Sequence, residues 1–500
     1  MLKPRRGLRP ACERLDVRWL PSGLSAAQLT NAYGLDAISF PSPSGTPVAG
    51  NGAGETIALV EAYHDPTLAS DMHVFDQANG LADPSLSVVD LAGTTANPDW
   101  TSEVSLDAEW AHAIAPGASI LVVEAPSDSI GNLMNAVSVA RGMPGVTVVS
   151  MSWGFGETSS ETAFDPTFTT PPGHSGITFI AASGDNGTVA GPEYPASSPN
   201  VLSVGGTTLL VNSSGNYLGE VAWSGSEGGY STAEPEPAYQ RSVQRIGRRS
   251  TPDVAFDGDP NTGVEVYETP PGSTSGLWIT VGGTSLGAPA WAAILAIVDQ
   301  GRALQGKGSL DGATQTLPAL YQLPSADFHP VSTPPSFSPW GGGVNPIGYN
   351  PIGGAFSHRR VKLIGRGALP HPLRANTSTG LGSPIAPRLI ADLVASETTE
   401  PLARVPTHAL AHRARWMLRV AKWHARTIRS SRDALEPLID PAPTGRRHNL
   451  AAPRSVMLKS FQSPVESGTH PSRGIPQCRD LVATSGPCWS SSIVAASSRP

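Results

Sequence analysis

Four short runs of almost uninterrupted apolar residues lie within the first 200 positions of the chain. They cover residues 55–62, 119–125, 146–152 and 177–183, and they are rich in Val, Ile, Leu and Ala. A strand that is buried on both faces of a sheet has this continuous pattern, whereas a strand with one face in water alternates. The four runs therefore predict buried strands of a parallel sheet.

Helical patterns separate or follow these strands. Residues 65–81 open with Asp-Pro, which is a helix-start signature, and residues 130–143 and 379–395 are two further helix candidates. The alternation of strands and helices predicts an α/β fold with a parallel sheet and helices on both faces. In such folds, ligands and catalytic groups gather beyond the carboxyl ends of the strands.

Residues 101–118 form another helical stretch, in which two acidic residues share a face with apolar ones. Four side chains fall within about 60° of each other on a helical wheel: Glu103, Asp107, Trp110 and Ile114. Glu109 and His112 fall on the opposite side. Burying carboxylates is unfavourable unless they are paired or protonated. The pattern therefore predicts two inward-facing carboxyl groups that share a proton; the alternative is an exposed stripe that includes Trp110.

Two further residues stand at positions typical of catalytic groups. Asp185 directly follows the apolar run 177–183, in a Gly-Asp-Asn-Gly turn that such a residue could also simply stabilise. Ser285 lies in GGTSLGAPAWAAILAI (282–297), between a glycine pair and a helical pattern. It is either a helix cap or a nucleophile at the positive end of a helix dipole.

Seven segments, taken in order, resemble the motifs of the sedolisin family, the serine-carboxyl peptidases with a subtilisin-like fold. These segments are 103–118, 149–154, 181–187, 193–207, 222–231, 251–263 and 282–293. The resemblance covers residues 23–395 and implies an endopeptidase that works in acid.

The resemblance also assigns expected roles to individual residues. Ser285 matches the nucleophile, Glu103 the general base, Asp107 the carboxyl group that tunes this base, and Asp185 the acid that stabilises the oxyanion. A carboxylic acid must be protonated to donate a hydrogen bond to an oxyanion, so we expect activity in acidic solution. Glu61, at the end of the first strand, is either a supporting acid or a solvent-facing strand end.

Three residues are expected to line the substrate cleft: Trp153, Gly228 and Gly229. An extended peptide can pair with exposed backbone in such a cleft. The alternatives are core packing for Trp153 and an ordinary loop for the two glycines.

The sequence departs from the family pattern at the calcium site. The family carries one Asp in an F-x-D segment and another shortly before the TG.GSP segment, where this chain has Pro330 and Asn376. Proline has no side-chain oxygen and asparagine has no charge, whereas calcium prefers several carboxylate and carbonyl oxygens. We therefore expect no certain cofactor and no metal ligand. The family's long prodomain also finds no match ahead of residue 23.

Changes in composition divide the chain into three parts. Residues 1–22 are a basic segment and residues 396–500 a basic Pro-, Ala- and Arg-rich tail, both expected to be mostly disordered, and 23–395 form the peptidase-like domain. Residues 401–500 hold 15 Lys or Arg and 5 Asp or Glu, hence a charge of +10, whereas the rest of the chain carries −17. Within the tail, 408–430 could form a basic amphipathic helix.

The cysteine positions and the hydropathy of the chain restrict which structural classes and cellular locations are expected. Its three cysteines, Cys12, Cys478 and Cys488, lie outside 23–395, so no disulfide framework is expected there. No apolar run is long enough for a transmembrane helix, and no ordinary signal peptide is visible. The resemblance nevertheless implies an extracellular or cell-envelope location. We expect polypeptide substrates, no nucleic acid partner and a monomer.

Two other functions compete with the acid peptidase. A conventional subtilisin triad needs a histidine at the start of a helix among small residues, and His64, His73, His112 and His174 lack that setting. An inactive sedolisin-like module with a binding or structural role would account for the altered calcium motif. It would not account for carboxylates kept on an apolar face.

Overall fold

The structure, a computed structural model, describes residues 23–42, 45–91, 93, 96–331 and 376–396, and the backbone of 489–490. The predictions for residues 1–22, for 408–430 and for the rest of the basic tail up to 488 lie outside the described residues. No helix in these ranges combines the length and the apolar character that crossing a membrane requires.

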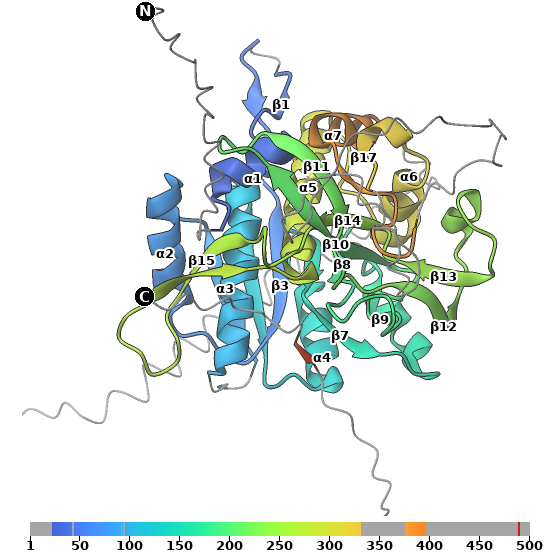
Figure 1. Cartoon of the computed structure of the whole chain (residues 1–500), viewed down its shortest axis with the longest axis horizontal. Helices are drawn as coiled ribbons and strands as arrows, with labels where there is room; N and C mark the ends of the chain where they lie inside the picture. Colours follow the sequence, from blue (N-terminus) through green and yellow to red (C-terminus); the bar gives the residue numbers. More distant parts are fainter. Residues whose placement is uncertain are drawn as a thin grey trace, which may run out of the picture. The chain divides into compact units, whose positions relative to one another are not determined.

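A mostly parallel sheet forms the centre of the domain (Figure 1). Its strands lie in this order: β11 (Tyr217–Ala222), β10 (Val201–Val211), β8 (Thr178–Ala182), β6 (Val146–Met151), β3 (Thr56–Ala62), β5 (Ser119–Ala125) and β4 (Leu86–Asp90). β14 (Val254–Asp257) also pairs with β10 in parallel, and β11 is antiparallel to β10. The four strands predicted from the apolar runs are β3, β5, β6 and β8, and their ends lie within one residue of the prediction.

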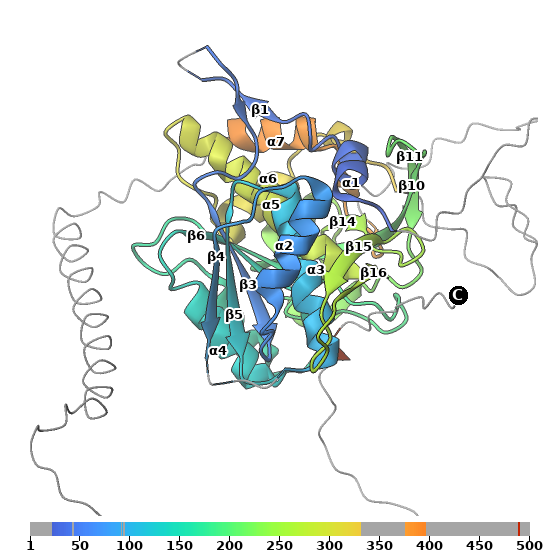
Figure 2. The ribbon, with the colours of Figure 1, turned by 90° about the vertical axis from the view of Figure 1, so that its left-hand side faces the viewer.

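Helices cover both faces of this sheet, as predicted. α4 (Ile130–Ala140) packs on β3 and β5 from one side, whereas α3 (Pro98–Ile114) and α5 (Thr284–Leu304) pack on the other. α2 (Leu68–Asn79) lies against α3, outside it relative to the sheet (Figure 2). The remaining helices are α1 (Ala26–Tyr33), α6 (Leu317–Leu320) and the predicted closing helix α7 (Ala386–Ala395).

Two-stranded ribbons and one three-stranded sheet complete the described structure. The ribbons are β1 (Ser39–Phe40) with β2 (Val48–Ala49), β12 (Gly229–Pro235) with β13 (Arg248–Thr251), β15 (Val264–Glu268) with β16 (Leu277–Val281), and β17 (Phe328–His329) with β18 (Ser383–Pro384). The small sheet consists of β19 (Trp489–Ser490), β7 (Trp153–Gly156) and β9 (Glu193–Tyr194). β7 follows β6 directly in the chain, and it pairs with one antiparallel strand on each side.

The helix α3 is buried on all sides from Glu103 to Ile114. Glu109 and His112 point away from the Glu103 stripe, but both are fully buried. Glu109 Oε2 accepts a hydrogen bond from the backbone N–H of Tyr267 on β15, and His112 Nε2 lies 2.9 Å from the carbonyl oxygen of Ala82. A helical wheel separates two faces but does not show that α2 and β15 cover the outer one.

Candidate active site

Ser285 lies in the first turn of α5, beyond the carboxyl ends of the central strands. The N-cap of this helix is Gly283, not Ser285, and its φ of 117° is a conformation that favours glycine. Ser285 is 1% exposed, and its Oγ makes no hydrogen bond of normal geometry among the described residues. The side chain therefore does not cap the helix, and its hydroxyl is left for another role.

Glu103 and Asp107 lie on α3, one turn apart, and both are fully buried. Ser152 Oγ donates a hydrogen bond to Asp107 Oδ2 at 2.7 Å and lies 3.3 Å from the carbonyl oxygen of Ser285. Burial and the charge of Asp107 raise the pKa of Glu103 well above its usual value, while the nearby hydroxyl of Ser285 lowers it. Glu103 therefore faces both the other carboxyl group and the serine.

Glu61, at the carboxyl end of β3, is a third member of this carboxyl cluster. It is fully buried, which excludes the solvent-facing alternative. Burial, followed by the charges of Asp107 and Glu103, raises the pKa of Glu61 well above its usual value. Burial raises the pKa of Asp107 to about 7, against the hydrogen bonds from Ser152 and Glu61. Three carboxyl groups so close together in a dry site must hold protons between them.

Asp185 approaches the same cluster from the loop that follows β8. Its Oδ1 accepts hydrogen bonds from both the backbone N–H and the Oγ1 of Thr284, each at 2.8 Å. Its Oδ2 faces Gly283, where a Cβ atom would lie only 2.7 Å away. Burial raises the pKa of Asp185 to about 6, against these hydrogen bonds from Thr284. The charge of Asp185 also raises the pKa of Glu103, so the two carboxyl groups are neighbours.

The residues expected to line the cleft differ in their surroundings. The side chain of Trp153 is fully buried, and its Nε1 donates to the carbonyl oxygen of Val60 at 2.9 Å, so it packs in the core and only its backbone on β7 can meet a ligand. Gly228 is buried, and a Cβ atom there would overlap the carbonyl oxygen of Thr377. Gly229 is half-buried at the start of β12.

Calcium ligands are not found at the positions where the family resemblance places them. Pro330 is exposed and offers no side-chain oxygen. Asn376 Oδ1 accepts hydrogen bonds from the backbone N–H groups of Ser378 and Thr379, both at 2.8 Å, so it closes its own turn. These two residues do not fit a calcium ion.

Another group of possible metal ligands lies at the ends of three strands. His64, Asp90 and Glu124 bring one ligand atom each within 4.8 Å of one another. His64 Nδ1 lies 2.8 Å from Glu124 Oε2, and the other oxygen of Glu124 accepts from the backbone N–H of Asp65. Both oxygens of Glu124 thus have protein partners.

The sequence analysis did not identify Ser152 and Thr284, whose hydrogen bonds hold Asp107 and Asp185 in place. Both stand inside segments that carry the family resemblance, so their position was visible but their partners were not. It also did not identify Glu193 and Glu227, whose carboxyl groups lie near Asp185, since the charge of Asp185 raises the pKa of both.

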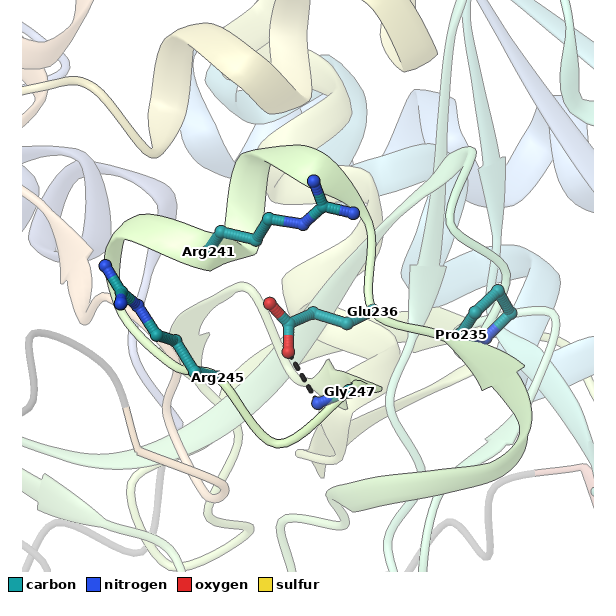
Figure 3. A pocket seen from close by; sticks show the side chains of 5 residues that line it. All are labelled: Pro235, Glu236, Arg241, Arg245 and Gly247. Carbon is teal, nitrogen blue, oxygen red and sulfur yellow. Dashed lines mark hydrogen bonds between the residues drawn. The ribbon is translucent and has the colours of Figure 1, made fainter.

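A cavity of about 570 Å³ lies apart from these residues (Figure 3). Its lining consists of Pro235, Glu236, Arg241, Arg245 and Gly247. Glu236 Oε2 accepts a hydrogen bond from the backbone N–H of Gly247 at 2.6 Å and so holds one wall. None of its lining residues belongs to the predicted site.

Comparisons with known proteins agree with the sequence motifs. A model of the subtilase family of peptidases matches residues 90–309. Kumamolisin from Bacillus sp. is 32% identical over 69% of this chain and 61% of its own length. Sedolisin from Pseudomonas sp. is 29% identical over 52% of this chain and 49% of its own. Human tripeptidyl-peptidase 1 is 27% identical over 55% and 51%.

A solved structure agrees as well. Pseudomonas sedolisin, described as a serine-carboxyl proteinase in complex with two molecules of pseudo-iodotyrostatin, superposes with a TM-score of 0.56 at 25% identity. The match covers 74% of this chain and 97% of that structure. The chain spans about half to three fifths of the length of the three curated relatives.

Proposed function

The chain belongs to the sedolisin family, and from this premise we propose that it is a serine-carboxyl endopeptidase that hydrolyses peptide bonds in acidic solution. The observation that carries the proposal is the cluster in which Glu103 neighbours Ser285, Asp107 and Asp185. A nucleophile, a paired base and an acidic hydrogen-bond donor around one point are the parts that acyl transfer needs.

In the proposed reaction, Ser285 Oγ attacks the carbonyl carbon of the peptide while its proton passes to the carboxylate of Glu103. The carbonyl oxygen becomes an oxyanion, to which the protonated carboxyl group of Asp185 donates a hydrogen bond. Glu103 then gives its proton to the leaving amine, the C–N bond breaks, and an ester on Ser285 remains. Water hydrolyses this ester by the same steps, with Glu103 again as the base.

Asp107 and Ser152 act in this proposal by holding Glu103 in position. The Ser152 hydroxyl fixes one oxygen of Asp107, and the other oxygen, which faces the carboxyl group of Glu61, can share a proton within the cluster. A base with a raised pKa can hold the proton that it takes from Ser285, whereas an ordinary carboxylate would release it.

A pH–rate profile on a mixed peptide library, from about pH 2 to 8, tests the proposal. Wild type should cleave with a maximum in acid, and Ser285→Ala should be inactive at every pH. Ser213→Ala is the matched control, because Ser213 is exposed and should leave the profile unchanged. A folded wild-type chain without activity at any pH would refute the proposal and favour an inactive module.

We also propose that the substrates are polypeptides and that the chain acts as a monomer, outside the cytoplasm or in the cell envelope. An active site that needs protonated carboxyl groups suits an acidic compartment. We propose that no calcium ion is bound through Pro330 and Asn376, because neither residue fits one.

A further inference from the structure

A row of acidic residues crosses the carboxyl ends of three neighbouring strands, next to the proposed active site. The parallel pairing sets Glu61 of β3 opposite Glu124 of β5, and Glu124 opposite Asp90 of β4. Residues paired in this way point to the same face of a sheet, and neighbouring strands lie about 4.8 Å apart. Glu61 belongs to the carboxyl cluster of the active site, whereas Glu124 and Asp90 have no part in the mechanism above.

A histidine reaches the outer two members of this row. The backbone of Tyr63 has a φ of 64°, which is uncommon for a residue other than glycine, and its N–H donates to the carbonyl oxygen of Ala125 at 2.8 Å. The chain thus turns toward β5 after β3 ends, and His64 Nδ1 lies 2.8 Å from Glu124 Oε2. One ligand atom each from His64, Asp90 and Glu124 lies within 4.8 Å of the other two.

Protein contacts fix the orientation of Glu124, the central member of this group. Glu124 is fully buried, and its Oε1 accepts a hydrogen bond from the backbone N–H of Asp65 at 3.2 Å. Its carbonyl oxygen accepts from the N–H of Leu91, the residue after Asp90, at 3.1 Å. Contacts of this kind orient a carboxylate for a metal ion. The side chain of His64 is 35% exposed and Asp90 is exposed, so an ion can enter from solvent.

We propose that His64, Asp90 and Glu124 bind one zinc ion, which ties together the ends of β3, β4 and β5. This site goes beyond the proposed function and does not depend on it. The donor set decides the metal, because zinc takes imidazole nitrogen together with carboxylate oxygens, and three protein ligands leave a position for water. Calcium takes about six to eight oxygen ligands and magnesium an octahedral oxygen shell, so neither suits a site in which one of three protein ligands is nitrogen.

The distances and charges of the group fit such an ion. Ligand atoms on a tetrahedral zinc ion lie about 3.3 Å apart, at metal–ligand bonds of about 2.0–2.2 Å. The hydrogen-bonded atoms of His64 and Glu124 therefore need to separate by about 0.5 Å, and the exposed carboxylate of Asp90 moves inward. Glu124 and Asp90 carry like charges on neighbouring strands, so a cation between them removes their repulsion.

The experiment measures zinc binding to the full chain at about pH 7, where imidazole can be neutral, by calorimetric titration and by thermal unfolding. The chain is first treated with a chelator and dialysed. Zinc chloride at about 100 times its dissociation constant should then raise the unfolding temperature by about 3–5 °C. A chelator changes nothing in the chain without zinc, but it should reverse this shift. Calcium chloride is the comparison and should give no shift.

Three substitutions identify the ligands. His64→Ala, Asp90→Asn and Glu124→Gln should each weaken zinc binding by at least about tenfold and abolish the shift in unfolding temperature. Asp90 is exposed, so Asp90→Asn should fold even if the change at the buried Glu124 prevents folding. His73→Ala is the matched control, because His73 Nδ1 lies 2.9 Å from Asp83 Oδ1 in another His–Asp pair, to which the described residues add no third ligand.

Each outcome supports or overturns the zinc site. A wild-type chain that binds no zinc at about 0.1 mM overturns it. So does zinc binding that His64→Ala and Asp90→Asn leave unchanged, because the ion then lies elsewhere in the chain. A larger shift with calcium than with zinc overturns the choice of metal. Peptide cleavage tests the proposed function separately, so a chain without activity that still binds zinc through these residues refutes only the proposed function.

Discussion

Asp185 offers the sharpest test of the carboxyl mechanism, through a pair of substitutions that separate hydrogen bonding from protonation. In Asp185→Asn, the amide oxygen can take the place of Oδ1 and accept both hydrogen bonds from Thr284. The amide NH₂ group then takes the place of Oδ2 and points toward the oxyanion. In Asp185→Ala no donor remains.

The magnitudes follow from the pKa of about 6 that burial gives Asp185. One pH unit above this value only about a tenth of the acid is protonated, so wild type should lose about tenfold in rate per pH unit beyond it. The amide donates at every pH, and the alkaline limb of Asp185→Asn should therefore no longer depend on this group. Asp185→Ala should lose about 10²–10³ in kcat at all pH values, the usual cost of one oxyanion donor.

The assay is kcat against pH on one peptide substrate, from about pH 3 to 8, for wild type and both variants. Thermal unfolding of each variant at pH 4 shows whether a lost activity is a lost fold. If Asp185→Asn keeps the wild-type alkaline limb, or if Asp185→Ala keeps the wild-type rate, Asp185 is not the oxyanion donor and this part of the mechanism is wrong.

Three further predictions concern stability and metal dependence. Gly283→Ala should lower the free energy of unfolding by about 1–3 kcal/mol, because φ is 117° there and the methyl group meets Asp185; an unchanged urea midpoint would contradict the strained turn. Thermal unfolding should occur at a higher temperature at pH 4 than at pH 7, because burial raises the pKa of three acids outside the active site to about 7, 7 and 8: Asp76, Glu161 and Glu234. The pKa values of these three acids in the folded chain exceed their values of about 4 in the unfolded chain. Their contribution to stability is therefore fully present below pH 4 and is lost as the pH rises to about 8. A higher unfolding temperature at pH 7 than at pH 4 would show that these acids are not buried. A chelator should change neither activity nor the unfolding temperature, since Asn376 binds its own turn; a higher unfolding temperature with added calcium would show a site elsewhere.

The sequence predicted the elements whose signal is local. β3, β5, β6 and β8 are buried on both faces, and that condition alone produces their apolar runs. The two carboxyl groups of α3 were predicted to face inward because the helical period relates Glu103 to Asp107. The same period could not show that Glu109 is buried as well, because burial of the outer face depends on β15, which is more than 150 residues away in the chain.

The rest of the site depends on contacts that no local pattern contains. The segment around Ser285 alone favours a helix cap over a nucleophile, and only the structure shows that Gly283 holds the N-cap position. Glu193 lies on a strand of only two residues, and Glu227 lies in a loop, so neither has a periodicity that could indicate its neighbour. Their proximity to Asp185 arises from the pairing of β7 with β9 and from the bond of Glu227 to Gly184.

Burial of Asp185 and Glu103 sets the upper and the lower limit of the pH range in which we expect activity. Asp185 must keep its proton to act as a donor, which restricts activity to pH values below about 6. Glu103 must accept the proton of Ser285, so the carboxyl groups of the cluster cannot all be protonated when the serine attacks. Burial raises the pKa of Glu103, and the further charges of Asp107 and Asp185 act in the same direction, so a second proton binds this cluster before strongly acidic solution is reached. The rate should therefore have a maximum in mild acid and fall on both sides. Replacing Glu61 by Leu should move the acidic limb to higher pH, because the protonated carboxyl group of Glu61 lowers the pKa of Asp107 and leucine cannot do so; an acidic limb that does not move would mean that Glu61 is structural only.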